Sequence, residues 1–76
     1  SVTMLSGAAS GIGRHMALAL YRRGHQLSLL DLDEPGLQRL MREEGLSEQR
    51  VLVRKLDVRD ASAWADVVAD TVSRFG

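Results

Sequence analysis

Short apolar runs alternate with longer amphipathic segments along the whole chain. The short runs comprise residues 2–5, 26–30 and 51–53, and their length is typical of buried strands. The longer segments repeat their apolar residues every three or four positions, which is the period of a helix that packs by one face. The order strand, helix, strand, helix, strand, helix predicts an α/β fold with a parallel sheet and right-handed crossover connections.

Capping residues mark the ends of the predicted helices. The first helix is predicted over residues 12–21, and Gly24 ends the segment that contains it. Asp33 is suited to cap the second helix, which Gly45 ends, and Asp60 is suited to cap the third. These signals predict short connections between the helices and the strands.

Each predicted helix carries an apolar stripe that we expect to face the sheet. The stripes are Met16, Ala17 and Leu20 in the first helix, Leu37, Leu40 and Met41 in the second, and Trp64, Val67, Val68, Thr71, Val72 and Phe75 in the third. Because Trp64 and Phe75 belong to one continuous helical face, we interpret them as core residues and not as a stacking surface for a cofactor.

Three glycines lie between the first predicted strand and the first predicted helix. Gly7 suits the backbone of a tight turn, Gly11 has no Cβ to keep a diphosphate from the main chain, and Gly13 allows close packing of the helix. The helix then directs its free N–H groups and the positive end of its dipole at an anion. We therefore predict a phosphate-binding loop that also includes Ser10 and Ile12.

An acidic residue, Asp31, ends the second apolar run. A carboxylate at the tip of this strand can accept hydrogen bonds from the adenosine ribose hydroxyls of NAD, and it repels the 2′-phosphate of NADP. The alternative is a carboxylate that caps the next helix, but Asp33 is better placed for that purpose.

The segment from Ser6 to Gly13 resembles the Thr-Gly-x-x-x-Gly-Ile-Gly signature of the short-chain dehydrogenase/reductase family. Ser6 replaces the threonine and keeps a hydroxyl able to bond to nearby backbone. Asp57-Val58, after the third predicted strand, is similar to the Asp-Val segment of that family. The resemblance implies a three-layer Rossmann fold in which the Asp57 side chain contacts the adenine amino group and the neighbouring backbone offers an N–H to the ring.

The resemblance also bears on the choice of cofactor. Relatives that prefer NADP often carry a basic residue at the positions of Ser10 or Leu32, and neither is basic here. Together with Asp31, this favours NAD over NADP as the cofactor. Arg14 lies in the first turn of the predicted helix, from which its side chain could still approach a phosphate.

Enzymes of the resembled family transfer hydride between a nicotinamide and an alcohol or carbonyl, using a serine and a Tyr-x-x-x-Lys motif. Here the only tyrosine, Tyr21, is followed four residues later by His25, and the only lysine is Lys55. We therefore assign no catalytic residue. We expect residues 1–76 to be the N-terminal part of a single NAD(P)-binding Rossmann domain whose remainder, with the catalytic residues, is not in this chain.

The resemblance implies a parent oxidoreductase with a small-molecule alcohol or carbonyl substrate, acting as a homodimer or homotetramer. A different class, a dinucleotide-binding module without catalysis such as a sensor or pseudoenzyme, stays open. A Rossmann-like methyltransferase also places an acid after its second strand, but such proteins lack the Gly-Ile-Gly helix opening.

Composition narrows the classes of partner. Ten basic and ten acidic residues give a net charge of zero, so bulk charge indicates no nucleic-acid or membrane partner. The chain has no cysteine, which is typical of a cytoplasmic location. His15 and His25 have no partners at metal-ligand spacing, so we expect no metal site.

Overall fold

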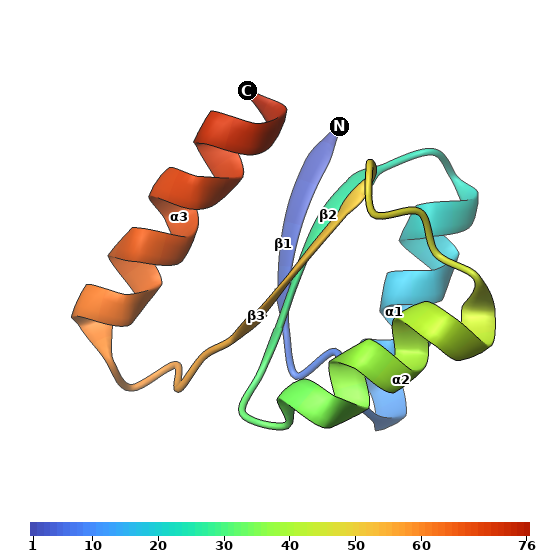
Figure 1. Cartoon of the computed structure of the whole chain (residues 1–76), viewed down its shortest axis with the longest axis horizontal. Coiled ribbons are helices and arrows are strands. Elements are labelled where there is room, and N and C mark those ends of the chain that lie inside the picture. The colour runs from blue at the N-terminus through green and yellow to red at the C-terminus, as the bar shows by residue number, and fades with distance from the viewer.

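The computed structural model of the chain describes all of residues 1–76 and alternates strands with helices (Figure 1). The elements in chain order are β1 (Val2–Ser6), α1 (Gly11–Arg22), β2 (Gln26–Asp31), α2 (Glu34–Glu44), β3 (Val51–Lys55) and α3 (Ala61–Phe75). This confirms the predicted α/β fold. The strands run one or two residues beyond the apolar runs, so that Ser6 and Asp31 end β1 and β2 as strand residues.

The sheet is parallel, with β2 in the centre between β1 and β3. Val2 pairs with Gln26 and Leu27 pairs with Val51, so the three strands start and end nearly level. The connections that leave the carboxyl ends of the strands therefore meet along one edge of the sheet. That edge is where the predicted site residues should gather.

Helices cover the two faces of the sheet unequally, which gives three layers. Figure 1 shows α1 and α2 on one side of the strands and α3 on the other. In β2, the fully buried Leu27 and Leu29 belong to the core under α1 and α2, whereas Leu30 belongs to a smaller core with Val67 of α3. The alternation follows from the pleat, which directs successive side chains to opposite faces.

Helix α1 packs by a face slightly different from the predicted one. Ala17 is fully buried, and Leu20 and Tyr21 pack against the core, but Met16 is 46% exposed. The helix approaches the β1 turn at Gly13, and Ala17 lies one turn further along the same face. The prediction for Met16 was therefore wrong, because the contact at Gly13 sets the rotation of the helix.

Helix α2 forms as its signals predict. The Asp33 carboxylate accepts a hydrogen bond from the Gly36 N–H at 3.0 Å, and Gly45 ends the helix in the left-handed conformation with φ of 62°. Leu37 and Leu40 are fully buried, and Met41 packs beside them. Both the caps and the stripe of this helix are confirmed.

Helix α3 is capped by Asp60, which accepts from the Ala63 N–H at 3.0 Å, but most of its predicted core stripe is exposed. Only Val67 and Thr71 are buried, while Val72 is 60% exposed. Trp64 and Val68 are 37% and 36% exposed, and Phe75 is half-buried. No second helix of this chain lies beside α3 on its face of the sheet, so only the line of residues directed at the sheet is covered.

A buried hydroxyl pair joins α3 to the centre of the sheet. Ser28 Oγ and Thr71 Oγ1 lie 2.6 Å apart, and the Thr71 hydroxyl donates to the Val67 carbonyl at 2.8 Å. Because Thr71 uses its proton in this way, the Ser28 hydroxyl donates to Thr71. Both residues are nearly inaccessible to water, with exposed fractions of 0% and 4%.

We expect Ser28→Ala and Thr71→Val each to lower the free energy of unfolding by about 1 to 2 kcal/mol, because each removes the hydrogen bond between the two buried hydroxyls. The double variant should lose less than the sum of the two single variants, since it removes both polar groups. Urea unfolding of the four proteins measures this coupling. Strictly additive losses would contradict a stabilising hydrogen bond between the two hydroxyls.

None of the helices combines the length and apolar character needed to cross a bilayer.

Candidate functional site

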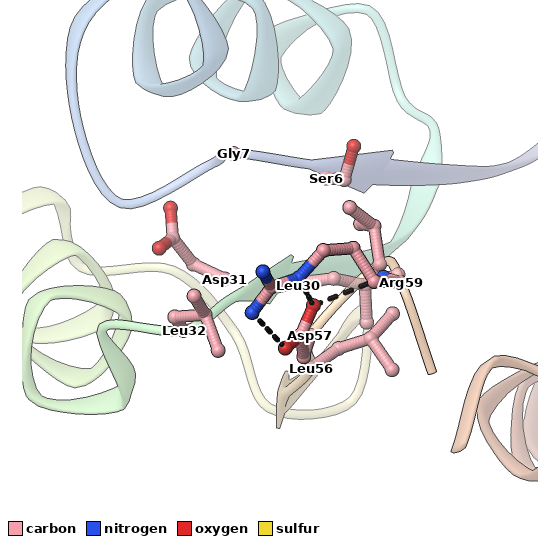
Figure 2. A pocket seen from close by; sticks show the side chains of 9 residues that line it. Ser6, Gly7, Leu30, Asp31, Leu32, Leu56, Asp57 and Arg59 are labelled. Atoms are coloured by element: carbon pink, nitrogen blue, oxygen red, sulfur yellow. Dashed lines mark hydrogen bonds and ion pairs between the residues drawn. The ribbon is translucent and has the colours of Figure 1, made fainter. Parts of the chain in front are cut away.

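A pocket of about 350 Å³ opens at the carboxyl edge of the sheet (Figure 2). It collects residues from the ends of β1 and β2 and from the connections that follow all three strands. The lining residues are Ser6, Gly7, Leu30, Asp31, Leu32, Leu56, Asp57, Val58 and Arg59. The pocket thus brings together the β1 turn and the two acidic positions that were predicted separately from the sequence.

The glycine loop is shaped by a close approach of backbone to backbone. Gly7 has φ of 70°, a left-handed conformation that favours glycine. A Cβ on Gly13 would lie 1.9 Å from the Gly7 carbonyl oxygen, which is far inside van der Waals contact. Only glycine at position 13 therefore lets α1 begin directly against the turn. A Cβ on Gly11, which has φ of 59°, would instead point into open space.

The first turn of α1 presents unused hydrogen-bond donors. The backbone N–H groups of Gly11, Ile12 and Gly13 have no acceptor in the structure, and Ser10, at the N-cap, makes no side-chain cap bond. Ser10 and Gly11 are exposed, and Ile12 is 81% exposed. Free N–H groups at the positive end of a helix dipole form a suitable site for a phosphate or diphosphate.

The Asp31 carboxylate connects the end of β2 to the glycine loop. Its Oδ2 accepts from the Ala9 N–H at 3.0 Å, and its Oδ1 accepts from the Asp33 N–H at 3.0 Å. Each carboxylate oxygen can accept two hydrogen bonds, so one position on each stays available for ribose hydroxyls. The sequence pattern located Asp31, but it gave no sign that Ala9 would hold the carboxylate in place.

Apolar side chains form the rest of the pocket between the two acidic residues. Leu30 and Leu56 are buried beneath it, whereas Leu32 and Val58 are 57% and 61% exposed. Exposed aliphatic side chains beside buried ones offer a surface on which a flat heterocycle can lie.

Asp57 is held by Arg59, two residues further along the same connection. The Arg59 Nε and backbone N–H both donate to Asp57 Oδ1 at 3.0 Å, and Arg59 Nη2 donates to Oδ2 at 2.8 Å. Figure 2 shows the Arg59 side chain folded back over Asp57 at the pocket. Sequence reasoning missed Arg59, and the only signal for it is its spacing of two residues from Asp57 within a turn.

The side-chain and backbone hydrogen bonds from Arg59 hold the pKa of Asp57 below its ordinary value of 3.8. A lowered pKa means that this contribution to stability is present above pH 3.8 and is lost as the pH falls through the folded-state pKa. We expect an NMR titration to give a midpoint below 3.8 for Asp57 and a higher midpoint in Arg59→Ala. An equal midpoint in both proteins would contradict the interaction.

Two side-chain interactions that the sequence allows are not formed in the structure. Arg14 does not approach the predicted phosphate site, because its guanidinium pairs with Glu44 at 3.3 Å and Glu43 at 3.5 Å on α2. The Ser6 hydroxyl makes no hydrogen bond to nearby backbone, and Ser6 is one of the residues that line the pocket. The attraction of two carboxylates at the end of α2 explains the direction of Arg14.

The only tyrosine lies at the opposite edge of the sheet. The Tyr21 hydroxyl accepts from the Ser47 N–H at 3.0 Å, and the Arg50 guanidinium lies 3.8 Å from the centre of the ring. Arg50 also donates to the Tyr21 and His25 carbonyls at 2.6 and 3.1 Å. Tyr21 therefore holds the connections at the amino end of the sheet together and has no place in the pocket.

Comparison with known proteins agrees with the fold. The model of the short chain dehydrogenase family matches residues 1–76. The NAD(+) 15-hydroxyprostaglandin dehydrogenase of Homo sapiens is 35% identical over 77 residues, which cover 99% of this chain and 29% of that protein.

Solved structures give the same result. A short-chain dehydrogenase/reductase described as glucose/ribitol dehydrogenase from Brucella melitensis superposes with a TM-score of 0.92 at 36% identity, over 99% of this chain and 32% of that one. A short chain dehydrogenase/reductase from Burkholderia phymatum, solved in complex with NAD, gives a TM-score of 0.90 at 28% identity over 100% of this chain and 27% of that one.

The chain thus belongs to the short-chain dehydrogenase/reductase family, a family of oxidoreductases with a Rossmann fold. It spans about 30% of the length of these relatives.

Proposed function

We propose that residues 1–76 form the N-terminal, cofactor-binding part of a Rossmann domain in an oxidoreductase that uses NAD in preference to NADP. The parent enzyme transfers hydride between the nicotinamide and a small alcohol or carbonyl substrate. The observation that carries the proposal is the arrangement at Asp31, whose carboxylate is bonded to Ala9 of the glycine loop and faces the pocket. One carboxylate thereby sets the distance between the ribose position and the phosphate position.

The residues of the chain fit the adenosine diphosphate half of NAD. Free N–H groups in the first turn of α1 suit the diphosphate, and Asp31 suits the ribose. Leu32, Val58 and the leucines beneath them suit the base, next to Asp57. The nicotinamide itself supplies the hydride-transfer chemistry when it is bound, and this chain offers no group for that step.

Charge supports the preference for NAD. The 2′-phosphate of NADP would lie against the Asp31 carboxylate, which repels it. The basic residue that lines the pocket, Arg59, is engaged by both oxygens of Asp57, and Arg14 pairs with the carboxylates of α2. Neither of these arginines is therefore free to compensate the 2′-phosphate.

The remaining proposals concern the intact enzyme. We propose a homodimer or homotetramer in the cytoplasm, with a small-molecule substrate and without a nucleic-acid or membrane partner. The exposed apolar residues Trp64, Val68 and Val72 along α3 are compatible with further packing against this helix.

A second candidate is a dinucleotide-binding module without catalysis of its own. Tyr21 packs at the amino end of the sheet and Lys55 is not spaced from it as a Tyr-x-x-x-Lys motif requires, so residues 1–76 do not distinguish this module from the enzyme. The pocket described above serves both candidates equally well.

Calorimetric titration of the intact protein with NAD and NADP, followed by an NADH absorbance assay with a panel of alcohols and ketones, tests the proposal. We expect NAD to bind more tightly than NADP and at least one substrate class to support turnover. NAD binding without any turnover would favour the non-catalytic module, and failure to bind either dinucleotide would overturn both candidates.

A further inference from the structure

The Asp57–Arg59 pair occupies the part of the pocket next to the apolar residues. Asp57 follows the buried Leu56, and Arg59 directly precedes Asp60, the cap of α3. The turn is already held by two backbone donors, since the Arg59 N–H bonds to Asp57 Oδ1 and the Asp60 N–H bonds to the Asp57 carbonyl at 2.9 Å. The two further bonds from the Arg59 side chain are therefore not needed to form the turn.

The side-chain pair contributes little to the stability of the fold. The Arg59 side chain is 84% exposed and the Asp57 side chain is 34% exposed. Ion pairs in such contact with water contribute little to folding, because solvent screens the attraction and the arginine loses rotamer freedom. What the pair does accomplish is to fix the orientation of one carboxylate at a ligand-sized pocket.

The hydrogen-bond capacity of Asp57 is nearly used. A carboxylate offers about four acceptor positions, two on each oxygen. Arg59 fills both positions of Oδ1, through its N–H and Nε, and one position of Oδ2, through Nη2. A single acceptor position on Oδ2 is left. The backbone N–H of Val58, the residue between them, has no acceptor in the structure.

We infer that Arg59 is a positioning residue for base recognition, holding Asp57 so that its one open acceptor position, together with the Val58 N–H, reads the amino edge of adenine. The inference rests on the proposed function, because it assumes that the pocket takes the adenosine half of a dinucleotide. Adenine presents an amino donor beside a ring-nitrogen acceptor. Hypoxanthine presents a carbonyl oxygen and a ring N–H instead. Its carbonyl oxygen faces the Asp57 carboxylate, which is acceptor against acceptor, and its ring N–H faces the Val58 N–H, which is donor against donor.

The test compares NAD with nicotinamide hypoxanthine dinucleotide, which differs from NAD only at this edge of the base. Dissociation constants for the intact protein are measured by calorimetry. We expect the wild-type protein to bind NAD at least about tenfold more tightly than the hypoxanthine analogue. In Arg59→Ala the ratio of the two dissociation constants should fall about fivefold or more, mainly because NAD binding weakens. Arg59→Lys, which returns one donor group, should recover part of the ratio.

Two controls separate positioning from charge and from folding. Arg54→Ala removes an equally charged arginine that pairs with Asp70 outside the pocket, and it should leave the ratio unchanged. Asp57→Ala should abolish the preference, and adding Arg59→Ala to that variant should change nothing further. Circular dichroism of each variant verifies that the protein remains folded.

An unchanged ratio in Arg59→Ala would overturn the inference, and so would tighter NAD binding, which would mean that Arg59 competes with the base for Asp57. Equal binding of both dinucleotides by the wild-type protein would overturn the inference and leave the proposed function standing. Binding of neither would overturn the proposed function, and the inference with it.

Discussion

Replacing Asp31 with alanine is expected to lower the ratio of NAD to NADP affinity about 100-fold. The carboxylate keeps one free acceptor position on each oxygen, and two charge-assisted hydrogen bonds to ribose hydroxyls contribute roughly 3 kcal/mol or more together. The substitution also removes the repulsion of the 2′-phosphate, which raises NADP affinity relative to NAD. Calorimetric titration of the intact protein with both dinucleotides measures the ratio.

The ratio is the informative quantity because Asp31 also bonds to the Ala9 N–H. Loss of that bond loosens the glycine loop and weakens NAD and NADP alike, so the effect cancels in the ratio. Asp33→Ala is the matched control, since it removes a neighbouring carboxylate whose bond caps α2. It should cost about 1 kcal/mol of stability and leave the ratio unchanged. A wild-type ratio in Asp31→Ala would contradict a ribose contact at this position.

The architecture could be predicted from the sequence because its signals are local. Hydrophobic period, helix caps and strand lengths depend on neighbours within a few residues, so the order of the elements and the caps at Asp33 and Asp60 were confirmed. The parallel order then places the strand ends on one edge, which brings Gly7, Asp31 and Asp57 to one pocket without further information.

What could not be predicted depends on which surfaces meet in three dimensions. A helical stripe shows which residues are apolar, but not how wide a surface the sheet offers, and so Val72 and Met16 were assigned to the core although they are exposed. The Asp31 bond to Ala9 joins residues separated by one complete helix and strand. Side-chain partners such as Glu44 for Arg14 depend on the crossing of two helices, which no local pattern records.

Alanine at position 13 is expected to have the largest effect on the phosphate-binding turn. Its Cβ would lie 1.9 Å from the Gly7 carbonyl oxygen and 2.6 Å from the carbonyl carbon, and both atoms are backbone. No side-chain rotation relieves this overlap, so either α1 or the turn must move. We expect a loss of about 1 to 3 kcal/mol in the free energy of unfolding. NAD affinity should fall about 100-fold, since the N–H groups of the first turn lose their alignment.

Gly45→Ala is the control for Gly13→Ala because it also adds one methyl group to a glycine but lies far from the pocket. Gly45 has φ of 62°, and a Cβ added there would point into open space, so its replacement costs only the left-handed backbone strain of about 1 to 2 kcal/mol. Urea unfolding should therefore show comparable losses for both variants, while NAD titration separates them. Wild-type NAD affinity in Gly13→Ala would show that the close approach of α1 to the turn has no part in binding the diphosphate.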